Sequence, residues 1–156
     1  MNSYNEFKLG GPRPSLEGVE VSDLAKELLE KTSFEEQSER SVTLVVVSLT
    51  DLGFSEEPLL GQIYEAAKNK GYSLCPAEVG PRLREIDPSA TDLYIAMEPI
   101  EVPYHGFTAQ EPRPIERCIY WLRVDDGVVC LTADTLGDPT GDDPWNLRAR
   151  FVFQAP

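Results

Sequence analysis

The stretch "YSLCPAEVGPRLREIDP" (residues 72–88) constrains the fold more than any other part of the chain. A cysteine stands directly before a proline, and a glutamate, a Gly-Pro step and two arginines follow within nine residues. Three interpretations are open: a reactive thiol at a helix start, a recognition helix, or a structural corner. The apolar side chains between the turn residues favour the corner, with Gly80-Pro81 opening a short helix that an Asp-Pro step ends. We therefore expect Cys75 to be a buried small hydrophobe.

The other two interpretations need partners that the sequence supplies poorly. A catalytic cysteine usually borrows a histidine as its base, and the single histidine, His105, lies in a proline-rich segment. As a recognition element, residues 62–86 would form a helix-turn-helix, with the hairpin at Asp126-Gly127 as a wing. The two arginines of its second helix stand against two glutamates, so that helix offers no net positive charge to phosphates.

Apolar periodicity outward from this stretch predicts an amphipathic framework. The sequence "VTLVVVSL" (42–49) is apolar on both faces, which is typical of a central strand. The segment 55–71 carries an i, i+3, i+4, i+7 apolar stripe and predicts a helix with Ser55 as its N-cap and Gly71 as its stop. A shorter amphipathic helix is expected after Ser22, another N-cap candidate.

The strand pattern completes an α+β assignment. Strands are expected near residues 43–49, 92–98, 115–124, 128–133 and 149–154. Asp126-Gly127 suits a type I′ turn, so Val124 is expected to face Val129 across a hairpin. The segment 99–114, with four prolines, predicts a long loop or an irregular edge.

The fold class is therefore a single α+β domain. We expect a mixed or mainly antiparallel sheet of about five strands, packed by two or three helices. Residues 1–21 contain five glycines and prolines and are expected to form an irregular lead-in. Residues 22–156 are expected to form the domain itself.

The charge of the chain limits its partners. Its 156 residues carry a formal net charge of −13, and acidic residues are in excess in every third of the sequence. Such a surface repels phosphate backbones and anionic membranes, so we expect no nucleic-acid partner and no membrane partner. Solubility explains the charge, and a basic partner or mimicry of nucleic acid is the alternative.

No segment of the sequence predicts a membrane helix or a leader. No apolar run approaches the roughly 20 residues that a membrane helix needs. The first residues lack a basic start followed by an apolar segment, so no secretory signal is expected. These features predict a cytoplasmic protein.

Metal and cofactor chemistry is not expected. The three cysteines, Cys75, Cys118 and Cys130, form no C-x-x-C pattern, which argues against a disulfide framework and a zinc site. The segment "DTLGDPTGDD" (134–143) offers four carboxylates of the kind that calcium prefers. Its spacing differs from an EF-hand loop, and Asp-Pro and Gly-Asp steps are ordinary turn chemistry.

Candidate binding residues come from two tryptophans and their neighbours. Trp121 lies between two arginines on one face of the expected hairpin, and Trp145 follows the acidic segment. An exposed tryptophan there would stack on a ligand or anchor a partner, whereas a covering helix would make it part of the core. The candidate binding set is Trp121, Arg117, Arg123, Trp145, Glu78 and Glu98. A binding site would be indicated if Glu78, Glu98, Trp121 and Trp145 converged on one concave pocket.

The run "LCPAEVGPRLR" (74–84), followed by "YIAMEPI" (94–100) and "RFVF" (150–153), carries a resemblance. With "LVVVSLTDLGF" (44–54), these pieces resemble the shared core of a group of uncharacterised bacterial hypothetical proteins. The chain departs from that group after Met97. The resemblance implies a bacterial, cytoplasmic protein and brings no activity or catalytic residues with it.

The functional expectation is a non-enzymatic acidic binding or accessory protein. No P-loop, GxGxxG, GxSxG or HExxH motif is present, so no catalytic residues are assigned. Its partner, a protein or a small molecule, is not named by the sequence. Two alternatives stay open: a hydrolase-like or thiol enzyme using Cys75 or a pair of glutamates, and a nucleic-acid mimic that binds a basic protein.

Overall fold

A computed structural model describes residues 3–35, 38–104, 108–136 and 143–156, which form an α+β fold. Three helices and an eight-stranded mixed sheet are present in these ranges. In chain order the elements are β1 (Ser3–Gly10), β2 (Glu20–Val21), α1 (Asp23–Lys31), β3 (Glu39–Ser48), α2 (Leu60–Asn69), α3 (Val79–Ile86), β4 (Leu93–Ile95), β5 (Ile100–Pro103), β6 (Ile115–Asp125), β7 (Val128–Thr135) and β8 (Arg150–Gln154). No helix in the described ranges is long and apolar enough to cross a membrane.

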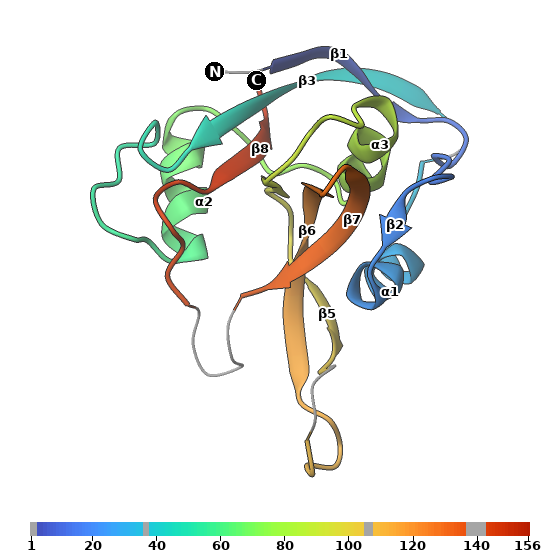
Figure 1. Cartoon of the computed structure of the whole chain (residues 1–156). Coiled ribbons are helices and arrows are strands. Elements are labelled where there is room, and N and C mark those ends of the chain that lie inside the picture. The colour runs from blue at the N-terminus through green and yellow to red at the C-terminus, as the bar shows by residue number, and fades with distance from the viewer. Residues whose placement is uncertain (1–2, 36–37, 105–107, 137–142) are drawn as a thin grey trace.

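The sheet is larger than expected and mixed in direction. Its strands run in the order β1-β3-β8-β4-β6-β7-β2, and β5 pairs with β6 (Figure 1). The pairs β4–β8 and β2–β7 are parallel, and the other described pairs are antiparallel. The α+β class is confirmed, but the count of about five strands was wrong, because β1, β2 and β5 were not predicted. β2 has 2 residues and β5 has 4, and β5 follows Pro99 and ends at Pro103, which edge strands tolerate.

The N-terminal residues are not an irregular lead-in throughout, which corrects the expectation for residues 1–21. Residues 3–10 form β1, antiparallel to β3, with Lys8 opposite Ser41. The register shifts between Tyr4 and Phe7, and Glu6 in this bulge has a φ of 53°. The polar sequence of β1 hid the strand, since Phe7 and Leu9 are its only buried large apolar side chains.

The hairpin of β6 and β7 has the predicted register. Val124 pairs with Val129, and Asp126 and Gly127 both have positive φ values, 48° and 79°, as a type I′ turn requires. Cys118 lies opposite Thr135 and Cys130 opposite Arg123, so the two cysteines are far apart in the ladder. All three cysteines are free and buried.

The helix ends follow local capping chemistry, with one correction. Ser22 caps α1 as predicted, accepting from the Ala25 backbone N–H at 3.1 Å. In contrast, α2 begins at Leu60, and Ser55 does not cap it. The Gln62 side chain accepts from the Leu59 N–H at 2.9 Å and so supplies the start signal.

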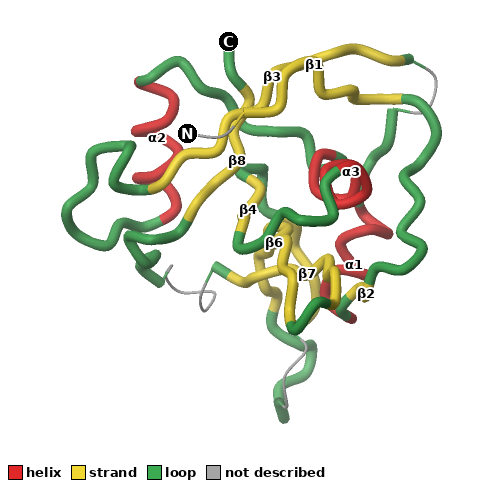
Figure 2. The backbone as a smooth tube through the Cα atoms, turned by 45° about the horizontal axis from the view of Figure 1, so that its top comes forward, coloured by secondary structure: helices red, strands yellow, loops and turns green. Residues whose placement is uncertain are grey.

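The helices lie on both sides of the sheet (Figure 2). On one side, α2 meets β8 through the edge-to-face contact of Tyr64 with Phe153. On the other side, α1 and α3 pack on β6. The Tyr120 hydroxyl of β6 forms a hydrogen bond with Thr32 at the end of α1, and the Tyr120 ring lies against Gly80 of α3. Strands β1 and β3 pass above α3 (Figure 1), which places the first strand of the chain beside a helix that begins about 70 residues later.

Candidate functional site

The structure places Trp121 in an aromatic cluster on the α2 side of the sheet. Its ring stacks on Tyr94 with centroids 5.2 Å apart and an interplanar angle of 11°. The Arg123 guanidinium lies over the Trp121 ring, 4.6 Å from its centroid. Trp121 is half-buried, so it is neither a free surface anchor nor a fully covered core residue.

Trp145 belongs to the same cluster and is buried. Its ring lies edge to face against Tyr94 and Phe151, with ring centroids 4.8 Å and 5.2 Å away, respectively. The indole N–H groups of both tryptophans are buried and have no acceptor among the described residues. The fold thus unites Trp121, Arg123 and Trp145 around Tyr94, a residue that the sequence did not single out. The signal for Tyr94 is its pairing with Trp121 across β4 and β6, which a local pattern does not contain.

A small hollow of about 260 Å³ borders this cluster, lined by Tyr94, Asp134 and Trp145 among others. Burial raises the pKa of Asp134, although hydrogen bonds from the Thr135 backbone N–H and from Tyr94 act in the opposite direction. Of the acidic segment 134–143, residues 137–142 lie outside the described residues. Within the described ranges, no three His, Cys, Asp or Glu side chains group as metal ligands.

The remaining candidate residues lie elsewhere. Arg117 is half-buried in β6, opposite Glu101 of β5. Glu98 is exposed and borders a different hollow, of about 450 Å³, beside Tyr64 and Tyr72. Glu78 is buried at the start of α3, with 1% of its surface exposed. The six predicted residues therefore do not converge on one pocket.

The Cys75 thiol is enclosed, as the sequence predicted. It is 4% exposed, and its Sγ donates to the Val152 carbonyl at 3.4 Å. Its backbone N–H bonds the Ala96 carbonyl at 2.7 Å. Burial raises the thiol pKa, which leaves little thiolate for nucleophilic chemistry. His105, its suggested base, lies outside the described residues.

The charged side chains of "CPAEVGPRLR" are structural. Arg82 Nε donates to Glu78 Oε2 at 2.6 Å, and its other two nitrogens donate to the carbonyls of Pro12 and Gly11 at 2.9 and 3.1 Å. This ion pair is buried, with the Arg82 residue 8% exposed. It therefore ties α3 to the segment that follows β1.

Arg84 ties the other side of α3 to the sheet. Its fully buried guanidinium donates to four backbone carbonyls, those of Arg123, Cys130, Asp87 and Ala90. Burial lowers its pKa, although the nearby Asp87 carboxylate acts in the opposite direction. With Arg82 and Arg84 both inside the fold, α3 presents neither guanidinium to a DNA backbone, and the helix-turn-helix interpretation loses its phosphate contacts.

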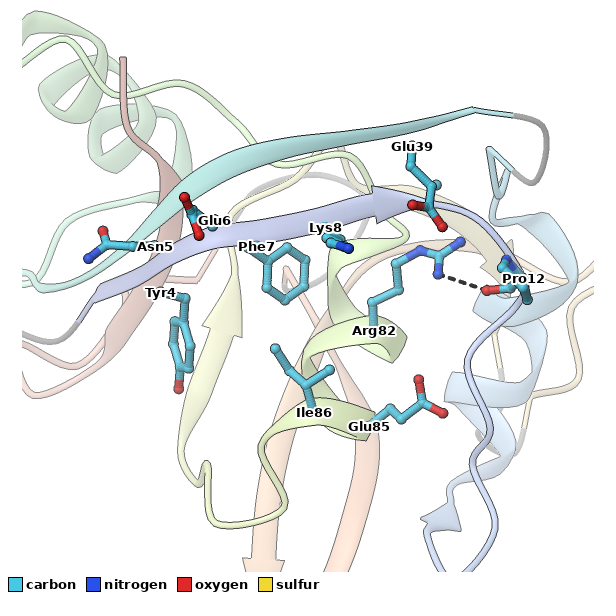
Figure 3. A pocket seen from close by; sticks show the side chains of 11 residues that line it. Tyr4, Asn5, Glu6, Phe7, Lys8, Pro12, Glu39, Arg82, Glu85 and Ile86 are labelled. Carbon is cyan, nitrogen blue, oxygen red and sulfur yellow. Dashed lines mark hydrogen bonds between the residues drawn. The ribbon is translucent and has the colours of Figure 1, made fainter.

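A groove of about 650 Å³ lies between β1 and α3 (Figure 3). We call this the β1–α3 groove; its lining residues are Tyr4, Asn5, Glu6, Phe7, Lys8, Gly10, Pro12, Glu39, Arg82, Glu85 and Ile86. Ile86 projects from α3 below β1 and is 58% exposed, the most exposed large hydrophobic side chain of the described residues. An exposed apolar side chain in a concave surface with polar walls is typical of an interaction site.

The charge of the β1–α3 groove is negative. Glu6, Glu39 and Glu85 contribute three carboxylates, and Glu85 also accepts from the Ser15 backbone N–H at 2.6 Å. The positive charge of Arg82 is matched by buried Glu78, which leaves Lys8 against three glutamates. The sequence did not reveal this groove, because one of its walls is the strand that it did not predict.

No family model, curated protein or solved structure matches the chain. The function therefore has to be argued from the geometry of the described residues.

Proposed function

We propose that this protein is a non-enzymatic acidic binding protein that holds a basic segment of a protein partner in the β1–α3 groove. The observation that carries the proposal is the exposed Ile86 side chain beneath β1, inside a groove with three glutamates on its walls. An apolar centre with charged surroundings is the usual layout of a protein-binding surface. The bacterial, cytoplasmic setting stays a prediction of the resemblance.

Charge favours a basic partner over an acidic or neutral one. The groove is acidic locally and belongs to a chain of net charge −13, so attraction over distance and contact in the groove have the same sign. This selection needs no catalytic group, in keeping with an enclosed Cys75 thiol. The cluster of Trp121 and Trp145 is a weaker candidate surface, because both rings already pack against Tyr94 and the Trp145 ring also packs against Phe151.

A defined peptide tests the proposal. The probe is a fluorescein-labelled peptide of eight residues in which Lys and Val alternate, and its binding is followed by fluorescence anisotropy. We expect the Ile86→Lys variant to weaken binding at least tenfold, because the substitution removes the apolar contact and adds a like charge. Raising the salt concentration should also weaken binding, because the attraction is screened.

Ile115→Lys is the matched control. Ile115 is 51% exposed in β6, outside the groove, and the substitution makes the same change of charge and size. It should leave the affinity within about twofold. Equal loss in both variants, or no binding of the probe up to about 1 mM, would contradict the proposal.

The thiol-enzyme alternative has its own test. Iodoacetamide added to the folded protein near pH 8 should leave Cys75 unmodified while unfolded protein is alkylated, since the thiol is buried and protonated. Mass spectrometry of the peptide around Cys75 reads the outcome. Fast alkylation of Cys75 in the folded state would favour the enzyme.

A further inference from the structure

We infer that the basic segment binds as an added β-strand on the free edge of β1. This inference rests on the proposed function and specifies how the groove holds its occupant. Strand β1 ends the sheet order, with β3 on one side and no described strand on the other. The β1–α3 groove runs along that open side (Figure 3), and an edge strand with unpaired backbone groups is a template for another chain.

The direction of the backbone groups in β1 supports this geometry. The Gly10 backbone N–H points away from β3, toward α3, and lies 3.4 Å from Glu78 Oε2. Alternate residues of a strand direct their N–H and C=O groups to the same side, so Lys8 presents its backbone pair to the groove. Leu9, between them, therefore directs its backbone N–H and C=O toward β3, where its Cα partner is Arg40. Lys8 is thus the residue whose backbone is expected to pair with the occupant.

The side chains around this edge define the sequence pattern of the occupant. The buried Phe7 and Leu9 side chains show that one face of β1 points to the interior, and the exposed Ile86 side chain lines the groove together with Phe7. Because side chains alternate along a strand, every second residue of an added strand lies on the face that Ile86 occupies, and the residues on this face should be apolar. The residues between them meet the glutamates of the groove wall, which favour Lys or Arg. A segment of alternating apolar and basic residues fits both rows.

The structure also limits what can add to this edge. The bulge at Glu6 and the lysine at position 8 are features that discourage indiscriminate strand pairing. A second copy of this chain is disfavoured, because each copy carries a net charge of −13 and the groove itself is acidic. The occupant is therefore a basic segment of a different protein.

Two N-methylated versions of the Lys/Val probe test strand addition. In one version the backbone nitrogen of every valine is methylated, and in the other the backbone nitrogen of every lysine. Each version therefore lacks the backbone N–H donors along one edge of the peptide and keeps those along the other edge. Only one edge can face β1, so one version should lose at least tenfold in affinity and the other should stay within threefold. Equal binding of both versions and the parent would overturn strand addition and leave the proposed function standing. If the unmethylated Lys/Val probe itself does not bind, or binds the Ile86→Lys variant equally well, the proposed function would be overturned.

Amide NMR gives a second readout on the protein. With the parent probe bound, hydrogen exchange of the Lys8 amide should slow at least tenfold, whereas the Leu9 amide, which faces β3, should be unchanged. Equal protection of the two amides would overturn the assigned edge. Light scattering on the protein without peptide should give a monomer, and a dimer lost in the Ile86→Lys variant would instead make a second copy the occupant.

Discussion

Gly80 lies where α3 touches β6, and the contact leaves no room for a side chain. A Cβ at this position would be 2.6 Å from Cδ2 and 2.7 Å from Cγ of Tyr120. The Tyr120 ring cannot retreat easily, because it is fully buried and its hydroxyl lies 2.7 Å from Thr32 Oγ1. The glycine of "CPAEVGP" therefore sets the distance between helix and sheet.

A Gly80→Ala substitution tests that contact, and Gly61→Ala in α2 is its matched control. Alanine favours a helix over glycine by about 1 kcal/mol, whereas overpacking a core costs about 1–3 kcal/mol. Since the two terms oppose each other at Gly80, we expect a net loss of up to about 2 kcal/mol in the free energy of unfolding. Nothing lies within 4 Å of a Cβ at Gly61, so that substitution should stabilise by about 0.5–1 kcal/mol. Urea unfolding measures both, and a stabilising Gly80→Ala would show that α3 does not press on Tyr120.

At the scale of elements, α3 joins three parts of the chain. Arg82 reaches the backbone after β1, Arg84 reaches β6, β7 and the 87–90 turn, and the helix itself covers Tyr120. Removing one member of a buried charged pair of this kind leaves an uncompensated charge inside the fold. Of the charged residues in the motif, the Glu78–Arg82 pair therefore holds the segment after β1, and Arg84 holds α3 to the sheet.

The buried Glu78–Arg82 pair predicts a non-additive pattern of stabilities. Arg82→Met leaves the Glu78 carboxylate buried without its partner and should cost about 3–5 kcal/mol in the free energy of unfolding. Glu78→Gln should cost less, because a glutamine oxygen still accepts from Arg82. The double variant should recover at least about 1 kcal/mol relative to the sum of the single variants.

Hydrogen exchange shows which part of the fold loses stability in the Arg82→Met variant. In Arg82→Met, the amides of β1 should lose protection before those of β6, because Arg82 holds Gly11 and Pro12 directly after β1. Additive single-variant effects, or a uniform loss of protection, would contradict the role of Arg82 as the fastener of β1.

For the whole molecule, buried thiols predict a loss of stability in alkali. Burial, with a smaller effect of the Glu116 carboxylate, raises the pKa of Cys118 from its ordinary value of 9.0 to about 12. Because the native pKa lies above the unfolded one, the stabilisation is fully present below about pH 9 and is lost as the pH rises toward the native pKa. Where the unfolded thiol is fully ionised and the native Cys118 thiol is still protonated, this group lowers the free energy of unfolding by about 1.4 kcal/mol per pH unit.

The Cys118→Ala variant isolates this contribution. The slope of the free energy of unfolding against pH, measured by urea unfolding between about pH 9 and 10, should be shallower by about 1 kcal/mol per unit than in the unsubstituted protein, because the unfolded thiol ionises over this range. Comparing slopes removes the constant cost of the lost side chain. An unchanged slope would mean that Cys118 is not held protonated in the folded protein.

Much of the framework could be predicted from local patterns. Periodicity identified α1, α2, β3 and β8, the Asp126-Gly127 turn determined the register of β6 with β7, and the apolar surroundings of Cys75 predicted its burial. These features depend on residues close in sequence, or on a single buried face that repeats every two or 3.6 residues. That is enough to establish the α+β class.

The tertiary structure alone decided the edge of the sheet and the candidate site. Strand β1 is polar and bulged, and it exists because β3, about 35 residues later, pairs with it. The β1–α3 groove brings Lys8 and Ile86 together from opposite halves of the chain, and Trp121 is half-covered only because β4 places Tyr94 against it. The local sequence indicates which residues prefer burial. Long-range pairing decides which surfaces meet, and no short sequence pattern contains that information.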